Sequence, residues 1–294
     1  MNLFTCFGEV LWDVFPDQEK IGGAPLNVAL RLQSYLNDVA IISSVGNDVL
    51  GKKLKDFILK NNLKSDYLQT DKILSTGRVN VTLDDKGSAS YEISQPVAWD
   101  NIQLNQASID RVKQSDVFIF GSLSSRNSVS KQTLLELLDH AKFKVFDVNL
   151  RPPFYNLELL QELMYKVDFI KFNDDELELI SNQLNSGTTS IEKNISFISK
   201  MFRVGHICVT RGSKGAIFLS DGKMYSNDGY KINVKDTVGA GDSFLASLLH
   251  KITSEDNNQK ALDFACAVGA LVAASEGANP KIREIDIDNI MSRK

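Results

Sequence analysis

The feature that most constrains the fold of this chain is an alternation of short apolar segments with segments of helical periodicity. The apolar segments are rich in β-branched and aromatic residues, as in strands buried on both faces. They are Leu3–Phe7, Val39–Val45, Val117–Phe120, Lys144–Val148, Phe169–Phe172, Ile207–Thr210 and Ala216–Leu219. The helical segments are Leu26–Leu36, Leu50–Leu59, Val129–Leu138, Glu158–Tyr165, Glu176–Leu184, Ile191–Phe202, Ser243–Ile252 and Lys260–Ser275. This order predicts an α/β fold, in which a central, mostly parallel sheet has helices on both faces.

One region breaks the alternation. Between Gly77 and Pro96, two segments of alternating polarity flank the sequence Asp84-Asp85-Lys86-Gly87, which is typical of a β-hairpin. The segment Val10–Ile21 is also extended in character. We therefore expect a small antiparallel sheet that stands off the core as a lid over an active site. Its strands, at about 10–21 and 77–97, are expected to be inserted into a single domain that spans residues 1–294.

Composition excludes several classes of protein. The 33 Lys and Arg against 37 Asp and Glu give a net charge of −4, whereas a nucleic-acid-binding protein has a basic surface. The sequence MNLFTCFGEV lacks the basic region and cleavage site of a signal peptide. The longest nearly uncharged segment, Phe264–Ser275, is shorter than the ~20 residues of a membrane span. Three widely spaced cysteines fit buried thiols in a reducing compartment. We expect a cytoplasmic protein with no nucleic-acid or membrane partner.

The sharpest local signal is the sequence Asp236-Thr237-Val238-Gly239-Ala240-Gly241-Asp242-Ser243-Phe244, directly before an expected helix. Small residues at a helix start let the backbone approach a ligand, and the free N–H groups and the helix dipole favour an anion such as phosphate. Asp242 alone would be explained as a helix N-cap. The preceding glycines and a second acid, Asp236, are not needed for a cap and favour a functional site.

Three other interpretations of glycine-rich sequences fit less well. A dinucleotide-binding fingerprint would need glycine at Phe244. The GDSL type of esterase needs a histidine near the C-terminus, and none follows His250. The segment Gly46–Lys53 approaches a Walker loop but lacks the Ser or Thr that would hold magnesium. The three histidines are isolated and form no zinc motif.

A second signal lies near the N-terminus, in Gly22-Gly23-Ala24-Pro25-Leu26-Asn27-Val28-Ala29. A glycine pair followed by proline is also what an ordinary helix start would show. Asn27, however, is a poor helix former within an otherwise good helix. This favours a role for Asn27 and the backbone of Gly23 in binding a polyhydroxylated ligand.

Together, these two signals resemble the paired signatures of the PfkB (ribokinase-like) carbohydrate kinase family. The resemblance spans essentially the whole chain, and the Gly77–Pro96 hairpin is similar to the family's β lid. Three further motifs resemble the family's, namely Gly46-x-Asp48-x-x-Gly51, Asn173-x-x-Glu176 and Thr210-x-Gly212-x-x-Gly215. Gly8–Pro16, Phe120–Leu123 and Asp147–Pro152 resemble segments of bacterial fructokinases. The last of these segments is shared with 2-keto-3-deoxygluconate kinases.

The resemblance implies a ribokinase-like fold and an ATP-dependent sugar kinase, with phosphorylation of D-fructose to fructose 6-phosphate as the favoured reaction. It makes Asp242 the catalytic base that takes the proton from the attacking sugar hydroxyl. The backbone N–H groups of Gly239, Ala240, Gly241 and Asp242 would form an anion hole for the transferred phosphoryl group. The implied cofactors are ATP and Mg²⁺, and many relatives also bind a monovalent cation such as K⁺.

The resemblance also assigns binding residues. Asp13, Gly23 and Asn27 match sugar-binding positions. Arg151 could steady a phosphate, bind the carboxylate of an acidic sugar or be structural. The nucleotide side would comprise Asn173, Thr210, Gly212, Gly215, Cys266, Gly269 and Asn279. Glu176 would act on magnesium through water, unless it is an ordinary first-turn acid. Asp236 and the carbonyl of Val238 match the monovalent-cation site of relatives.

Alternatives remain within and outside the kinase class. The sugar could instead be 2-keto-3-deoxygluconate or ribose, and a nucleoside is a less favoured substrate. A sugar-binding sensor that has lost catalysis is the alternative from another class, although Asp242, the glycines before it and Glu176 are all retained. Because exposed strand edges can pair with a second chain, we also expect a homodimer formed through the lid.

Overall fold

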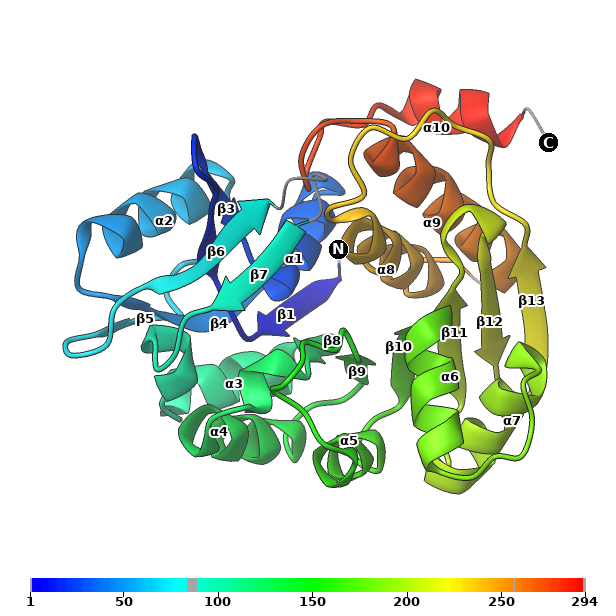
Figure 1. Ribbon diagram of the computed structural model, residues 1–294, viewed down its shortest axis with the longest axis horizontal. Coiled ribbons are helices and arrows are strands. Elements are labelled where there is room, and N and C mark those ends of the chain that lie inside the picture. Colours follow the sequence, from blue (N-terminus) through cyan, green and yellow to red (C-terminus); the bar gives the residue numbers. More distant parts are fainter. Residues whose placement is uncertain (1, 84–88, 256, 293–294) are drawn as a thin grey trace. The chain divides into compact units, whose positions relative to one another are not determined.

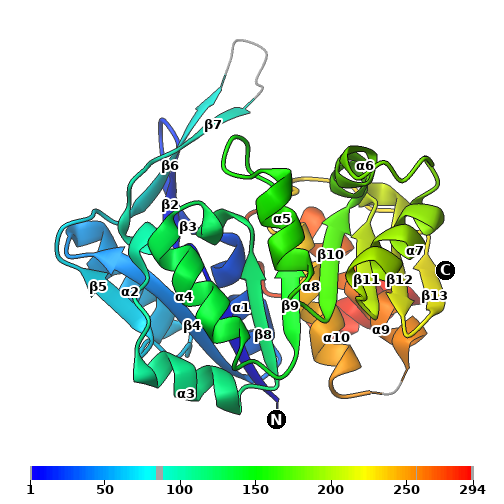
Figure 2. The same ribbon diagram turned by 90° about the horizontal axis from the view of Figure 1, so that it is seen from below.

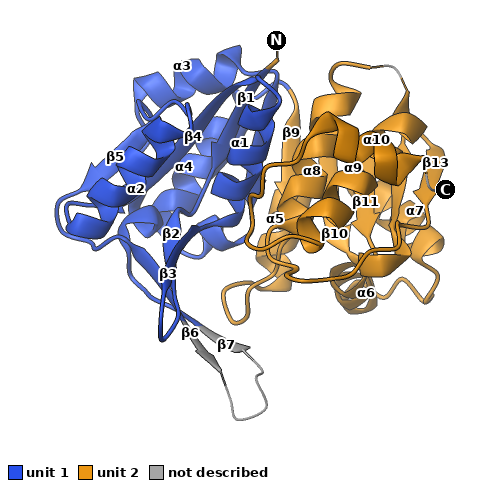
Figure 3. Cartoon of the chain, turned by 90° about the horizontal axis from the view of Figure 1, so that it is seen from above, with its two compact units in different colours: residues 1, 3–142 blue, residues 2, 143–294 orange. Residues whose placement is uncertain are grey.

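The computed structural model describes residues 2–83, 89–255 and 257–292 (Figures 1 and 2). The chain divides into two compact units, which Figure 3 shows in separate colours. Unit 1 spans residues 3–142, and unit 2 spans residues 143–294 together with Asn2. The expectation that residues 1–294 act as a single domain stays a prediction.

Four parallel strands form the main sheet of unit 1, in the order β8-β1-β4-β5. They are β1 (Leu3–Phe7), β4 (Asp38–Gly46), β5 (Leu68–Asp71) and β8 (Val117–Gly121). Helices α1 (Ala24–Ser34) and α2 (Val49–Lys60) lie on one face, and α3 (Gln106–Gln114) and α4 (Ser128–Leu138) lie on the other (Figure 1). Short 3₁₀ turns occupy Ala98–Asn101 and Leu123–Ser125. Because helices cover both faces, β1 and β8 are mostly apolar and buried, as the sequence predicts. β5, at the edge of this sheet, is mostly polar.

A second, smaller sheet of unit 1 has the order β3-β2-β6-β7. Its strands are β2 (Leu11–Val14), β3 (Glu19–Gly22), β6 (Gly77–Leu83) and β7 (Ala89–Ile93). They fall within the two segments expected to form the lid, and β6 and β7 pair antiparallel as a hairpin requires. The turn expected at 84–87 lies outside the described residues.

The expectation of a wholly antiparallel small sheet is wrong for one pair of strands. β2 and β6 run parallel, with Leu11 opposite Gly77. A short connection favours antiparallel pairing of β2 with β3, whereas the long connection from β3 to β6 leaves the direction of the β2–β6 pairing free. The chain forms α1, β4, α2 and β5 on the way.

Unit 2 is built on a sheet with the order β13-β12-β11-β10-β9. Its strands are β9 (Lys144–Asp147), β10 (Phe169–Asn173), β11 (His206–Thr210), β12 (Ala216–Ser220) and β13 (Lys223–Asn227). β9, β10 and β11 are parallel, while β12 and β13 are antiparallel additions at one edge. The expectation of a mostly parallel sheet is therefore confirmed.

Helices cover both faces of the unit 2 sheet. α5 (Leu157–Met164), α6 (Asp174–Gln183) and α7 (Ile191–Phe202) lie on one face (Figure 2). α8 (Ala240–Ile252), α9 (Asn258–Ala273) and α10 (Glu284–Met291) lie on the other, and Gly212–Lys214 form a 3₁₀ turn. All three cysteines are free and buried, as expected. Across the described ranges, no helix is both long enough and apolar enough to cross a membrane.

Candidate active site

The N-terminus of α8 is built on a glycine rather than on a capping side chain. Gly239 is the N-cap, with the left-handed angles φ 75° and ψ −1°, and the helix begins at Ala240. A side chain at Gly239 would collide with Ala278, because an added Cβ would lie 2.6 Å from the Ala278 Cα. Asp242 is the third residue of the helix, so the alternative that it is merely the N-cap is wrong. The N–H groups of this first turn have no partners within the helix.

Asp236 fixes the loop that leads into α8. Its Oδ1 accepts a hydrogen bond from the Val238 N–H at 3.0 Å, and its Oδ2 accepts one from the Gly277 N–H at 3.1 Å. The carboxylate therefore joins the loop before α8 to the loop after α9. The expected monovalent-cation role of Asp236 and the Val238 carbonyl stays a prediction, since backbone hydrogen bonds alone account for the position of this carboxylate.

A buried ion pair lies beside the start of α8. Lys171 of β10 and Asp147 of β9 are register neighbours, and the Lys171 Nζ donates to the Asp147 Oδ1 at 2.9 Å. Lys171 is 6% exposed and Asp147 is 4% exposed. A Cβ added to Gly241 would lie 3.5 Å from the Lys171 Nζ, so the ammonium group faces the glycine of the first turn.

The charge of Lys171 is held by carboxylates. Burial acts to lower the pKa of Lys171, but the nearby Asp147, followed by Glu176 and Asp242, outweighs it and raises this pKa above its ordinary value. The ammonium therefore remains protonated at neutral pH. Its interaction with Glu176 of α6 and Asp242 of α8 also shows that the first turns of these two helices lie near the same lysine.

Asn173 and Glu176 form a capping box at the start of α6. The Asn173 Oδ1 accepts the Glu176 N–H at 2.7 Å, and the Glu176 Oε2 accepts the Asn173 N–H at 2.8 Å. The Glu176 Oε1 also accepts the Leu150 N–H at 2.9 Å. The expectation that both residues share a face is confirmed. Burial, the largest influence, raises the pKa of Glu176 above its ordinary value.

The acidic groups near Lys171 fit a magnesium ion that keeps its water. No group of three or more His, Cys, Asp or Glu is placed to hold a metal within the described part of the chain. Mg²⁺ commonly uses only one or two carboxylates, together with waters and substrate phosphates. Glu176 supplies a carboxylate, and the buried Asp147 Oδ2 has no hydrogen-bond partner among the described residues. This donor set suits a magnesium ion bound through water and phosphate oxygens.

The turn between β11 and β12 contains two glycines with different structural roles. Gly215 has φ 76° and ψ −134°, and a side chain there would run into the backbone of Asn227. Gly212 has φ 55°, and a Cβ on it would meet open space. Packing therefore explains Gly215 without a ligand, whereas Gly212 leaves room beside Thr210. The Thr210 hydroxyl donates to the Phe172 carbonyl at 3.3 Å.

The residues expected near adenine lie on α9 and in the loop after it. Cys266 is buried, and Gly269 is three residues further along the same helix. A Cβ on Gly269 would make an ordinary contact, at 3.5 Å from both the Ala240 carbonyl oxygen and the Phe244 Cβ, so this glycine supports close packing of α9 on α8. Asn279 is exposed. Their nucleotide role stays a prediction.

The expected sugar-binding residues cluster at the start of α1 in unit 1. Gly23 is the N-cap of α1, with φ 113°, and the Glu9 carbonyl leaves no space for a side chain. Asn27 is buried in the first turn. The Asp13 carboxylate of β2 lies against the Cα of Gly22. These three residues therefore gather around the Gly22–Gly23 backbone, and their function stays a prediction.

Arg151 is exposed and follows β9 in unit 2. Its Nη1 donates to the carbonyl of the adjacent Leu150 at 2.9 Å. It forms no ion pair with any described residue, so the fold itself makes little use of its charge. The phosphate, acidic-sugar and structural alternatives for Arg151 all stay predictions.

Residues 3–285 match the family described as pfkB family carbohydrate kinase. The chain belongs to this family. It is therefore an ATP-dependent sugar kinase, and the kinship and the α/β fold expected from the sequence are confirmed.

Relatives of this PfkB kinase agree with that assignment. A putative sugar kinase of Pyrococcus horikoshii is 30% identical, covering 91% of this chain and 85% of its own length. Fructokinase-2 of Oryza sativa subsp. japonica is 28% identical, covering 97% of this chain and 92% of its own length. A solved structure of a fructokinase double mutant from Vibrio cholerae, with fructose, ADP and potassium ion, has a TM-score of 0.85 at 22% identity, over 99% of this chain and 98% of that one.

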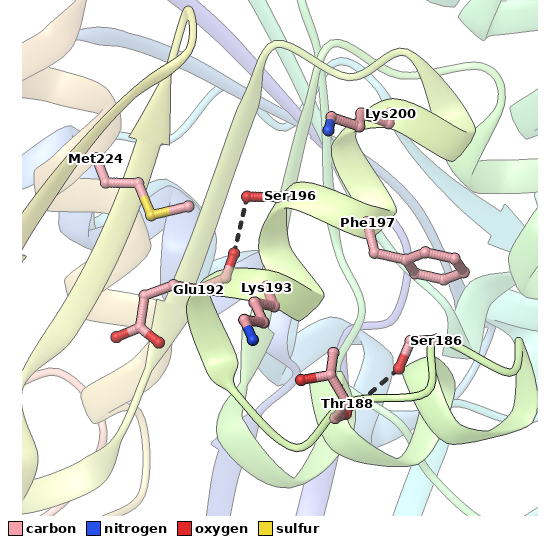
Figure 4. A pocket seen from close by; sticks show the side chains of 8 residues that line it. All are labelled: Ser186, Thr188, Glu192, Lys193, Ser196, Phe197, Lys200 and Met224. Carbon is pink, nitrogen blue, oxygen red and sulfur yellow. Dashed lines mark hydrogen bonds between the residues drawn. The ribbon is translucent and has the colours of Figure 1, made fainter.

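A cavity elsewhere in the PfkB kinase contains none of the expected site residues. It measures about 500 Å³ and lies between α7, the loop before it and Met224 of β13 (Figure 4). Its walls include Glu192, Lys193 and Lys200 from α7. The features expected of a phosphate site, namely the glycine start of α8 and the capping box of α6, are elsewhere in unit 2.

The sequence interpretation of this PfkB kinase missed Lys171. Lysine within Phe169-Ile170-Lys171-Phe172 lies in a strand that is otherwise apolar. A charge in such a strand needs a buried partner, and Asp147 at the end of the preceding strand is the acid that provides it. This pairing of a mid-strand lysine with a strand-end aspartate was the available signal.

Proposed function

We propose that this PfkB kinase transfers the γ-phosphoryl group of ATP to D-fructose and forms fructose 6-phosphate. The observation that carries the phosphoryl-transfer assignment is the start of α8, where a left-handed glycine takes the N-cap position and Asp242 lies in the first turn. Support for fructose comes from the relatives, which include proteins named fructokinase from a plant and a bacterium.

Asp242 acts as the general base in this proposal. Its carboxylate takes the proton from the attacking sugar hydroxyl, the sugar oxygen bonds to the γ-phosphorus, and the bond from phosphorus to the ADP oxygen breaks. The N–H groups of Gly239, Ala240, Gly241 and Asp242 stabilise charge on the transferred group. Phosphoryl transfer asks little more of a protein than positioning and neutralisation of charge.

Magnesium would lie where Glu176 can contact its water shell, with Asp147 as the second nearby acid. Bound there, the ion neutralises phosphate charge and orients the transferred group. Asn173 and Glu176 fix each other through the capping box, so the chain holds the acid in place before any ligand binds. We include K⁺ in the proposal because the V. cholerae fructokinase structure contains a potassium ion.

Nucleotide contacts are proposed for Thr210, Gly212 and the Cys266–Gly269 face of α9, with Asn279. Gly212 leaves open space above the turn, which allows a ligand to approach the backbone. Asp13, Gly23 and Asn27 are proposed to bind sugar hydroxyls, because an ionised carboxylate can accept hydrogen bonds from two hydroxyl groups.

Arg151 favours a second candidate substrate. Arg151 is exposed and bonds the Leu150 carbonyl, and its guanidinium could bind the carboxylate of 2-keto-3-deoxygluconate bidentately. Ribose is the remaining sugar alternative. A non-catalytic sugar sensor is disfavoured by the retained Asp242 and by the glycine N-cap before it.

The test is an ADP-release assay with fructose, ribose, 2-keto-3-deoxygluconate, tagatose and adenosine. Turnover should be highest with fructose. Turnover with 2-keto-3-deoxygluconate alone would show that this sugar, and not fructose, is the substrate. Sugar binding without turnover of any of the five compounds would support the alternative of a non-catalytic sugar sensor. Comparing rates in K⁺ and in a bulky organic cation tests the cation, because equal rates would remove it from the proposal.

A further inference from the structure

We propose that Lys171 is a catalytic residue whose ammonium group binds the phosphoryl group transferred at the start of α8. This inference rests on the proposed kinase function and adds to it a cation that the sequence motifs do not include. Toward the phosphoryl group, Asp147 is then a positioning residue that acts through Lys171, in addition to its proposed place beside magnesium.

The first argument is that Lys171 has hydrogen-bond donors to spare in a buried place. An ammonium group has three donors, and the Lys171 Nζ makes one hydrogen bond, to the Asp147 Oδ1 at 2.9 Å, among the described residues. The residue is 6% exposed, so little water can satisfy the other two donors. A buried charge with unused donors is costly unless a partner arrives, and an anion would be such a partner.

The second argument is direction. Lys171 lies in the middle of the register row Asp147–Lys171–Cys208, and adjacent residues in such a row point to the same face of the sheet. On that face, the Nζ is 3.5 Å from where a Cβ of Gly241 would be. No side chain at position 241 separates the ammonium from the first-turn N–H groups of α8. The same turn therefore offers an anion both backbone donors and a full positive charge.

The third argument is that structural pairing alone explains this pair poorly. A buried ion pair repays its desolvation only when its remaining donors and acceptors are also satisfied. Here the Asp147 Oδ2 has no hydrogen-bond partner among the described residues, and Lys171 has two unused donors. A phosphate group could accept hydrogen bonds from Lys171, and water could donate one to the Asp147 Oδ2, so these ligands would satisfy both members of the pair.

The experiment uses the full chain and compares Lys171→Met with Lys171→Arg. Lysine-to-methionine replacement removes the charge and keeps most of the volume. We expect kcat to fall about 10²–10³-fold in Lys171→Met, as when one donor to a developing anion is removed, with the KM for sugar nearly unchanged. The kcat of Lys171→Arg should be at least tenfold higher than that of Lys171→Met, because arginine restores the charge. Lys200→Met, an exposed position on α7, is the matched control and should retain wild-type kcat.

A second measurement remains informative if Lys171→Met is unstable. Affinities for adenosine, ADP and a non-hydrolysable ATP analogue are measured by calorimetry without Mg²⁺, so that the proposed place of Asp147 beside magnesium does not contribute. Wild type is compared with Lys171→Met,Asp147→Leu, which replaces the whole pair by apolar side chains and should fold. The loss should be smallest for adenosine and largest for the ATP analogue. Equal losses for all three ligands, or wild-type kcat in the double variant, would overturn the inference.

The two proposals fail in different ways. If wild-type protein turns over none of the sugars, the proposed function fails before any variant is compared. If wild type is active and Lys171→Met keeps kcat within twofold, the kinase stands and Lys171 is structural.

Discussion

Asp242 occupies the third position of α8, one helical turn from the glycine that caps the helix. An acidic residue at the N-cap would accept hydrogen bonds from the first-turn N–H groups through its side-chain oxygens. With glycine at that position, no N-cap side chain competes with a ligand for those N–H groups, and the Asp242 carboxylate is not needed as a cap. In the proposed mechanism, the glycine therefore separates two tasks, anion binding by the backbone and proton transfer by the side chain.

Replacing Asp242 by asparagine should remove the base and leave the anion hole. We expect kcat to fall by a factor of about 10²–10⁴, with the KM for sugar changed less than tenfold. Steady-state ADP release measures both constants, and a thermal melt confirms folding. A variant with wild-type kcat would show that another group takes the proton.

The two glycines of the β11–β12 turn give a matched pair of stability variants. Gly215→Ala places a methyl group against the Asn227 backbone at φ 76° and ψ −134°, and we expect a loss of at least about 1–3 kcal/mol in the free energy of unfolding. Gly212→Ala meets open space at φ 55° and should lose about 1–2 kcal/mol.

Urea unfolding measures both losses, and ADP release measures the nucleotide KM. We expect Gly212→Ala to raise the KM for ATP beyond what its loss of stability would cause. Gly215→Ala should show no such additional rise. If Gly215→Ala were the milder substitution, the packing explanation of this turn would be wrong.

At the scale of elements, Asp48 joins helix α2 to the root of strand β6. Its Oδ1 accepts the Gly51 N–H at 2.7 Å and caps α2. The same carboxylate accepts the Thr76 N–H at 2.8 Å and the Thr76 hydroxyl at 2.7 Å, one residue before β6 begins. This side chain, which belongs to the Gly46–Gly51 motif, thus anchors the small sheet.

Removing that anchor should affect more than helix capping. Asp48→Ala should lose about 1 kcal/mol of stability as an N-cap and should also raise the KM for sugar, because the root of β6 is released. Asn105→Ala is the control, since Asn105 caps α3 through the Ser108 N–H at 2.8 Å without contacting the small sheet. Thermal melts and sugar KM values are compared. If both variants had the same KM for sugar, the proposal that Asp48 anchors the small sheet for sugar binding would be wrong.

The sequence predicts the buried elements better than the peripheral ones. The expected Ile191–Phe202 helix matches α7 because its apolar residues follow one stripe. β5, β13, α3 and α10 were missed. β13 is an edge strand with mostly exposed residues, and α3 buries only Ser108, Arg111 and Val112, so neither carries a clear apolar period. The parallel pairing of β2 with β6 joins strands that are far apart in the sequence, so no local sequence pattern predicts it.

At the scale of the whole molecule, acidic pH should weaken unit 1 through its bonded carboxylates. Burial acts to raise the pKa of Asp48, but hydrogen bonds from Thr76 and Gly51 outweigh it and lower this pKa. The pKa of Asp38 is lowered too, because hydrogen bonds and the positive charges of Lys64 and Arg111 outweigh burial. Hydrogen bonds also outweigh burial at Asp71 and lower its pKa. A lowered folded-state pKa stabilises the fold above the unfolded value of about 3.9, and this stabilisation is lost as the pH falls through the folded value.

We therefore expect the free energy of unfolding to fall more steeply below about pH 4 in wild type than in Asp48→Asn. Urea unfolding at a series of pH values measures the difference. Asp66→Asn, at an exposed position, serves as the control and should follow the wild-type slope. Parallel curves for wild type and Asp48→Asn would mean that Asp48 contributes nothing to the acid response.

The small sheet also bears on assembly. Its outer strands are β3 and β7, and a strand edge with free backbone groups can pair with a second chain. We predict a homodimer formed through these edges. Light scattering at micromolar concentration should give twice the chain mass of 32.7 kDa, and a monomer mass would contradict the prediction.

The rate at which the buried cysteines react with a labelling reagent can report local opening of this molecule. Burial raises the pKa of the Cys6 thiol in unit 1 and of the Cys208 thiol in unit 2, so an alkylating reagent must wait for the surrounding structure to open. Since Cys6 and Cys208 lie in different units, the labelled peptide that contains one or the other identifies which unit has opened. Labelling rates with and without sugar or ATP would then report, separately for each unit, how strongly each ligand suppresses opening.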